Sequence, residues 1–194
     1  YDTKELRRLI PYDPVKAIGL YRRAATKHFS DAGYAALQAA FGYIFHIGHL
    51  PLDWGLIADL THMAATKERF MFSLPYIGYM RIHGLGVTKN IRFGVQSLTR
   101  VLDEEKRALE EEDRVLFYDI TRALTRVALG YAYEKGYVTG KPDLDAAVAY
   151  YEESHQYILS HKANLDEELK DIPIDNEAEE RLAAFEETDG HWYY

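Results

Sequence analysis

A short glycine pattern recurs along the chain and limits what it can fold into. An apolar residue, a glycine and an aromatic tyrosine stand together three times, with a second glycine six residues after the first. The three copies are "FGYIFHIG" from Phe41, "IGYMRIHG" from Ile77 and "LGYAYEKG" from Leu129. Self-similarity at intervals of tens of residues is typical of repeat architectures, in which each unit is one supersecondary structure.

A second segment follows each copy and is led by a residue that caps helices. Asp53, Asn90 and Asp143 lead the three complete copies, and Asp13 leads a partial copy that has only this second half. A carboxylate or amide there accepts hydrogen bonds from free backbone N–H groups at the start of a helix. The first segment has apolar residues at helical spacing and ends at a glycine, such as Gly136, which closes a helix in the left-handed conformation. Each unit is therefore predicted to be a pair of helices.

The predicted fold is all-α, because no strand-like alternation of any length occurs along the chain. We expect helices near residues 4–10, 14–28, 32–47, 54–69, 71–83, 91–107, 112–135, 144–162 and 176–187. They form a single domain over residues 1–194, with repeat units at about 1–30 (partial), 31–69, 70–107 and 112–162 and a C-terminal cap and tail at 163–194. The last helix has an acidic outer face, which suits the end of a stack of repeats.

The glycines inside the first helices need a packing reason, because glycine in mid-helix costs about 1 kcal/mol relative to alanine. These glycines are Gly42, Gly78 and Gly130, and each comes directly after an apolar core position. Small residues recur on the second helices, at Ala17, Gly94 and Ala147. A missing side chain on one helix and a small one on the next allow the two backbones to approach closely, and the attraction between the closely packed atoms offsets the cost.

At these residues the chain resembles the Sel-one-like repeat family, which is related to the tetratricopeptide repeats. "IGYMRIHGLGVTKN" keeps the turn of the family at Gly84, Gly86 and Val87, while "LGYAYEKG" and "KAIGLYRRAA" keep its two helices. The resemblance covers about residues 13–155. It implies a right-handed α-solenoid that binds proteins or peptides in a concave groove lined by the first helices. It also implies a non-enzymatic adaptor without a cofactor, of the kind found in bacterial regulation and host interaction.

The resemblance further implies which side chains face the groove. The residue after each helix glycine is Tyr43, Tyr79 or Tyr131, and in the related tetratricopeptide arrangement this position faces the groove. Three exposed tyrosines would form a ladder of flat, amphipathic contacts. One turn further on, the same face is expected to present His46, Ile82, His83, Glu134 and Lys135. The alternative is that the tyrosines pack between neighbouring helices and contact no ligand.

The charge distribution narrows the class of partner. The net charge of −8 argues against a nucleic-acid partner. Residues 1–100 hold 13 Lys and Arg against 7 Asp and Glu, whereas residues 101–194 hold 10 against 24. An elongated fold keeps these charges apart, which suits docking of an acidic partner or charge-driven self-association at the basic end. The alternative is a solvated surface that keeps a repeat protein soluble and binds no partner. No apolar run approaches the roughly 18 residues that a membrane span requires.

Two other interpretations stay open. A helical metal-binding enzyme would use His46, His49 and His62, or Glu152 with His155 at the E-x-x-H spacing of di-iron bundles, although the second E-x-x-H copy is missing. The absence of cysteine excludes disulfides, thiolate zinc sites and cysteine nucleophiles. The third interpretation is a self-assembling fragment of a larger repeat protein, since the first repeat is truncated. The chain begins at Tyr1 rather than at a methionine, so we expect a trimmed or processed piece.

Overall fold

The computed structural model describes residues 13–27, 31–44, 50–67, 70–110, 119–162 and 173–187. These residues form eight α-helices and no strand, which confirms the predicted all-α class. The helices are α2 (Pro14–Ala25), α3 (Ala32–Ile44), α4 (Trp54–Thr66), α5 (Phe70–His83), α6 (Ile91–Glu110), α7 (Asp119–Glu134), α8 (Leu144–Lys162) and α9 (Pro173–Glu187). The helix expected at 4–10 lies outside the described residues.

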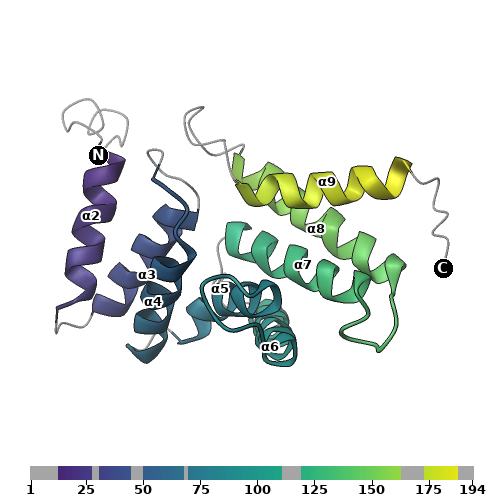
Figure 1. Ribbon diagram of the computed structural model, residues 1–194, viewed down its shortest axis with the longest axis horizontal. Helices are drawn as coiled ribbons and strands as arrows, with labels where there is room; N and C mark the ends of the chain where they lie inside the picture. The colour runs from purple at the N-terminus through teal and green to yellow at the C-terminus, as the bar shows by residue number, and fades with distance from the viewer. Residues whose placement is uncertain are drawn as a thin grey trace.

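Helices that are adjacent in the sequence are also adjacent in space (Figure 1). Each helix packs mainly against the helices directly before and after it, and further contacts join α2 with α4, α5 with α7, and α7 with α9. In Figure 1, α2, α3 and α4 stand side by side at one end, α5 and α6 lie in the middle, and α7, α8 and α9 form the other end. This nearest-neighbour packing is that of the predicted α-solenoid.

The four predicted caps all begin a helix. The side-chain oxygens accept hydrogen bonds from the backbone N–H three residues further on, at 2.8, 3.0, 3.0 and 3.1 Å for Asp13, Asp53, Asn90 and Asp143. Each cap satisfies one of the N–H groups that have no partner within the helix. The recurring acidic or amide residue in the sequence is therefore the start signal of every second helix.

The turns after α5 and α7 are closed in a similar way, although the next left-handed glycine is Gly86 in the first turn and the more distant Gly140 in the second. Their closing glycines, Gly84 and Gly136, have φ values of 77° and 69°, in the left-handed region predicted for a helix end. Beyond each turn, the cap residue donates its backbone N–H back to the first helix, Asn90 to Arg81 at 2.8 Å and Asp143 to Tyr133 at 3.1 Å. The pairs α5–α6 and α7–α8 are therefore equivalent, even though an arginine replaces the aromatic residue in one of them.

Glycines bring the paired helices together as predicted. A Cβ atom added to Gly78 would lie 2.5 Å from the Leu98 side chain, and one added to Gly94 would lie 2.9 Å from the Gly78 carbonyl oxygen. A Cβ atom added to Gly130 would lie 2.7 Å from the ring of Tyr151. At Gly78 and Gly94 the two backbones therefore pack directly against each other, whereas Gly130 makes room for the ring of Tyr151 and not for the small residue Ala147 that the sequence pattern suggested.

Gly42 makes its close approach differently. A Cβ atom added there would overlap the side chain of Ile18 in α2, the helix that precedes α3. The neighbour is thus Ile18 and not the small residue Ala17 that the sequence pattern suggested. Gly42 therefore joins the partial first unit to the second one.

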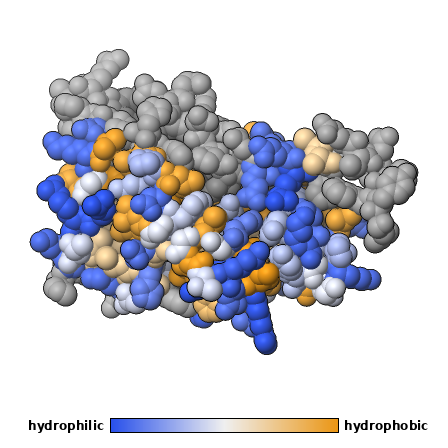
Figure 2. All heavy atoms as spheres, in the orientation of Figure 1, coloured by the Kyte–Doolittle hydropathy of each residue, from blue (hydrophilic) through white to orange (hydrophobic). Residues whose placement is uncertain are grey.

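The apolar core follows the stack of helices. Fully buried apolar residues come from each of α2 to α9, and most of them belong to one continuous cluster. On the face drawn in Figure 2, hydrophobic residues gather mainly over α2–α4, while hydrophilic residues predominate over α7–α9. None of the helices in the described part of the chain is long and apolar enough to cross a lipid bilayer.

Candidate functional site

Five rings from α4, α5, α7 and the turn after α7 form a continuous row, which we call the aromatic row. Its members are Trp54, Tyr79, His83, Tyr131 and Tyr137. Successive ring centroids lie 5.8, 4.5, 4.7 and 6.1 Å apart. All four distances are within the range of about 4.5–7 Å in which aromatic pairs attract each other. His83 thus joins two of the predicted tyrosines, which come from different repeats, into one surface.

The exposure expected for the tyrosine ladder is wrong for two of its three members. Tyr43 and Tyr79 are each only 8% exposed, and Tyr131 is half-buried. Tyr43 lies in the contact between α2 and α3, where its hydroxyl accepts a hydrogen bond from Arg22 at 3.3 Å. The neighbouring Gly42 brings these two helices so close that the ring of Tyr43 is enclosed.

Ile82 is not a groove residue either. Its side chain is fully buried and faces α6, where a Cβ atom added to Gly94 would lie 2.7 Å from Ile82 Cγ1. The space left by the missing side chain of Gly94 is thus filled by Ile82. The predicted groove residue His46 lies outside the described residues.

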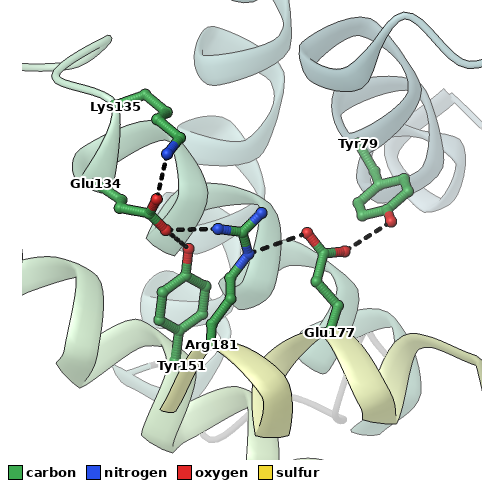
Figure 3. A network of polar contacts seen from close by, with 6 residues as sticks. All are labelled: Tyr79, Glu134, Lys135, Tyr151, Glu177 and Arg181. Atoms are coloured by element: carbon green, nitrogen blue, oxygen red, sulfur yellow. Dashed lines mark hydrogen bonds and ion pairs between the residues drawn. The ribbon is translucent and has the colours of Figure 1, made fainter. Parts of the chain in front are cut away.

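The C-terminal helix α9 contacts two members of the aromatic row, Tyr79 and Tyr131, and Figure 3 shows its contact with Tyr79. The Tyr79 hydroxyl donates to Glu177 Oε2 at 2.8 Å, and Arg181 donates to Glu134 Oε2 at 2.6 Å. The guanidinium of Arg181 also lies 4.8 Å from the ring centroid of Tyr131, a cation–π distance. Glu177 and Arg181 are four residues apart and therefore project from one face of α9. The sequence predicted α9 as an end cap, but it did not predict that this helix buries Tyr79.

Glu134 is the centre of the network in Figure 3. Its carboxylate accepts hydrogen bonds from Tyr151 at 2.8 Å and from Arg181, and it pairs with Lys135 at 2.5 Å. Burial alone would raise the pKa of Glu134, but the hydrogen bonds from Lys135 and Tyr151 and the charge of Arg181 together lower that pKa below its ordinary value. Glu134 therefore holds a fixed negative charge beside aromatic rings.

Burial sets the protonation states of the rings next to this charge. Burial lowers the pKa of His83 and outweighs the opposite effect of the Glu177 carboxylate, so the imidazole is neutral at pH 7. The Nε2 atom of His83 is itself buried and has no hydrogen-bond partner among the described residues. Burial, reinforced by Glu177, raises the pKa of Tyr79, so its phenol keeps the proton that it donates.

A second polar cluster, which the sequence did not reveal, joins α6, α7 and α8. Arg126 pairs with Glu105 at 2.6 Å and with Glu153 at 3.1 Å, and its guanidinium lies 5.0 Å from the ring centroid of Tyr157. The side chains of Arg126 and Glu105 are only 9% and 6% exposed. A pair this deeply buried connects helices and is not available to a ligand.

The described residues of the metal-enzyme alternative, His62, Glu152 and His155, form no metal site with other described side chains. In the described part of the chain, no group of three or more His, Asp or Glu side chains is arranged to hold a metal ion. His155 Nδ1 instead lies 3.6 Å from Glu179 of α9, and His62 and Glu152 are exposed. His49 lies outside the described residues, as does His46.

The contacts that α9 makes were the part of the site missing from the sequence interpretation. Glu177 and Arg181 belong to a segment without any repeat pattern. One signal was present, because Arg181 is the single basic residue of the otherwise acidic helix "PIDNEAEERLAAFEE". A lone arginine beside apolar residues on an acidic helix suggests a buried carboxylate partner elsewhere.

Comparison with protein families finds the Sel1 repeat at residues 6–28, 76–96 and 121–154. The last two stretches contain most of α5 and of α7, and with them six of the predicted groove residues, Tyr79, Ile82, His83, Tyr131, Glu134 and Lys135. Searches of the curated proteins and of the solved structures gave no match.

Proposed function

We propose, from the premise that this chain carries Sel1 repeats, that it is a non-enzymatic interaction module whose protein or peptide partner binds along the aromatic row. Sel1 repeats generally mediate protein–protein interaction. The partner spans the two equivalent units α5–α6 and α7–α8, since the row runs from one first helix to the other.

The observation that carries this proposal is the continuity of the row across two repeats. Aromatic side chains and charged groups in desolvated positions supply most of the free energy of protein interfaces. Tyr131 offers a half-buried ring, and Glu134 and the more exposed Lys135 place opposite charges at its side. A peptide with both apolar and charged anchors matches this combination.

The test is capture of a binding partner by the intact protein and by two variants. Tyr131→Ala removes the ring that α7 contributes to the row, whereas Phe93→Ala removes a 43% exposed ring from α6, outside the row. We expect wild type and Phe93→Ala to bind the captured partner alike and Tyr131→Ala to bind at least about tenfold more weakly, which corresponds to about 1.4 kcal/mol. Equal affinity of all three proteins, with unchanged circular dichroism, would remove the row from the proposed interface.

A further inference from the structure

The described side chains of α9 that contact the aromatic row do so through a hydrogen bond and a cation–π interaction. Of the α9 side chains that the structure describes, at 177–184, only Ala178 is fully buried, and Leu182 is partly buried. The first helix of the neighbouring unit is different, because α7 buries six apolar side chains, Ala123, Leu124, Val127, Ala128, Leu129 and Ala132. Among the described residues of α9, Glu177 and Arg181 are the ones that contact the aromatic row.

The surface under α9 is built from side chains of α5, α7 and α8. Tyr79 of α5 supplies a hydroxyl donor for a carboxylate. Glu134 of α7 supplies a carboxylate for a guanidinium, and the rings of Tyr131 and Tyr151 lie beside that guanidinium at 4.8 and 5.8 Å. The Tyr79 hydroxyl and the Glu134 carboxylate together match a helix that has an acidic residue followed by an arginine four residues later, since these two positions share one helix face.

One buried polar atom of this surface has no hydrogen-bond partner among the described residues. The Nε2 atom of His83 is buried between the rings of Tyr79 and Tyr131 and is without a hydrogen-bond partner in the described part of the chain. A buried polar atom without a partner lowers the stability of the arrangement that buries it. Helix α9 therefore satisfies the carboxylate and the phenol of this surface but not its imidazole.

We propose that α9 is an exchangeable occupant of this surface and that the partner replaces it with a helix of related chemistry. That helix carries Asp or Glu followed four residues later by Arg, together with a polar group that reaches His83. The inference rests on the function proposed above and names the chemistry of the partner segment. Release of α9 is then the step that opens the row.

A synthetic peptide of residues 173–187 is the probe for this surface. Titrated against the full-length protein, it should bind weakly, because α9 of the same chain competes with it. In a chain with Glu177→Ala and Arg181→Ala the competitor is weakened, and we expect the peptide to bind at least tenfold more tightly. The control chain is Glu180→Ala, since Glu180 is exposed on α9 and makes none of these contacts, and it should bind the peptide as wild type does.

The chemistry of recognition is tested in the same titration. A peptide that carries Arg181→Ala should bind the Glu177→Ala/Arg181→Ala chain at least tenfold more weakly than the normal peptide does. The normal peptide should lose the same affinity when Glu134→Gln is added to that chain. Equal binding of the normal peptide to the wild-type chain and to the Glu177→Ala/Arg181→Ala chain, or no binding to either, would overturn the proposal. A wild-type dimer with exchanged α9 helices would also overturn it, because the occupant would then be a second copy.

Hydrogen exchange of the wild-type protein gives a test that needs no variant. We expect the backbone amides of α9 to exchange at least tenfold faster than those of residues 123–134 in α7, since α9 must leave without unfolding of the solenoid. Equal protection of the two helices would make α9 a permanent element and overturn the proposal. Capture of a partner that depends on Tyr131 would in that case still support the interaction module, so the two proposals fail separately.

Discussion

At the scale of single residues, Glu134 of α7 connects three helices. Its carboxylate is bonded to side chains from α8 and α9 and to the adjacent Lys135. These donors favour the charged form, and for this reason the pKa of Glu134 lies below its ordinary value of 4.5. The protonation state of this one group therefore controls how firmly α9 is held.

The stability of the protein should depend on pH through Glu134. Between its lowered folded pKa and the ordinary value of 4.5, the unfolded chain binds more protons than the folded one. The stabilisation is therefore present above pH 4.5 and is lost as the pH falls through the folded value. We expect Glu134→Gln to lower the free energy of unfolding by about 1–2 kcal/mol at pH 6 and by less at pH 3, as measured by urea unfolding. A difference between the two proteins that stays constant with pH would contradict this account.

The glycines of the helix contacts give a second prediction at this scale. Gly94→Ala places a methyl group against the backbone of α5 and should destabilise the protein by about 1–3 kcal/mol. Gly19→Ala is the matched control, because nothing lies within 4 Å of the added methyl group, and higher helix propensity should stabilise it by roughly 0.5–1 kcal/mol. Thermal or urea unfolding of both variants measures these shifts. Equal effects of the two substitutions would mean that close helix packing is not the reason for Gly94.

Single residues could be predicted from sequence where the cause is local. The caps and the left-handed glycines depend only on the nearest few residues, and the repeat pattern aligned them correctly. The exposure of Tyr43 and Ile82 depends on which neighbouring helix covers them, so it could not be predicted from position within a repeat. Tyr79 is buried for the same reason, because α9 covers it.

At the scale of elements, a side-chain cap begins each second helix, and in α6 a close backbone contact with α5 accompanies it. The sequence predicted the bounds of α8, residues 144–162, as they are found. It placed the start of α9 at residue 176, whereas the helix begins at Pro173. The position of α9 on the aromatic row could not be predicted, since the bond between Tyr79 and Glu177 joins residues 98 positions apart in sequence. No periodicity in the sequence connects those two segments.

The caps give a prediction for one element. Asn90 begins α6 by accepting a hydrogen bond from the backbone N–H of Phe93 at 3.0 Å. Asn90→Ala removes this bond and should cost about 1 kcal/mol of stability. Asn90→Asp restores the residue used by the other units and should retain stability, because its charge also interacts favourably with the helix dipole. Urea unfolding distinguishes the two variants, and equal destabilisation by Ala and Asp would contradict the capping role.

At the scale of the whole molecule, the solenoid separates charge along its length. The first hundred residues are net basic and the remainder is strongly acidic. Lys16 and Arg23 are exposed on α2 at one end of the molecule, and α9 is at the other (Figure 1). Opposite charges at the two ends favour contact between copies, or between this protein and an acidic partner.

Salt should weaken association that arises from this polarity. We expect the association constant between copies to fall at least tenfold between 0.05 and 0.5 M NaCl, because exposed charges are screened over shorter distances. Lys16→Glu with Arg23→Glu should weaken association already at low salt. Sedimentation velocity measures both effects. Association that is unchanged by salt and by the charge reversal would exclude a charge-driven contact.

The central claim is that the aromatic row is where this protein meets its partner. A photoreactive benzoylphenylalanine placed at position 131 tests it directly, with the same group at position 93 on α6 as the matched control. We predict a specific partner adduct from position 131, reduced by an excess of the peptide of residues 173–187, and none from position 93. An adduct from position 93 alone, or from neither position under conditions in which the partner is captured, would contradict the claim.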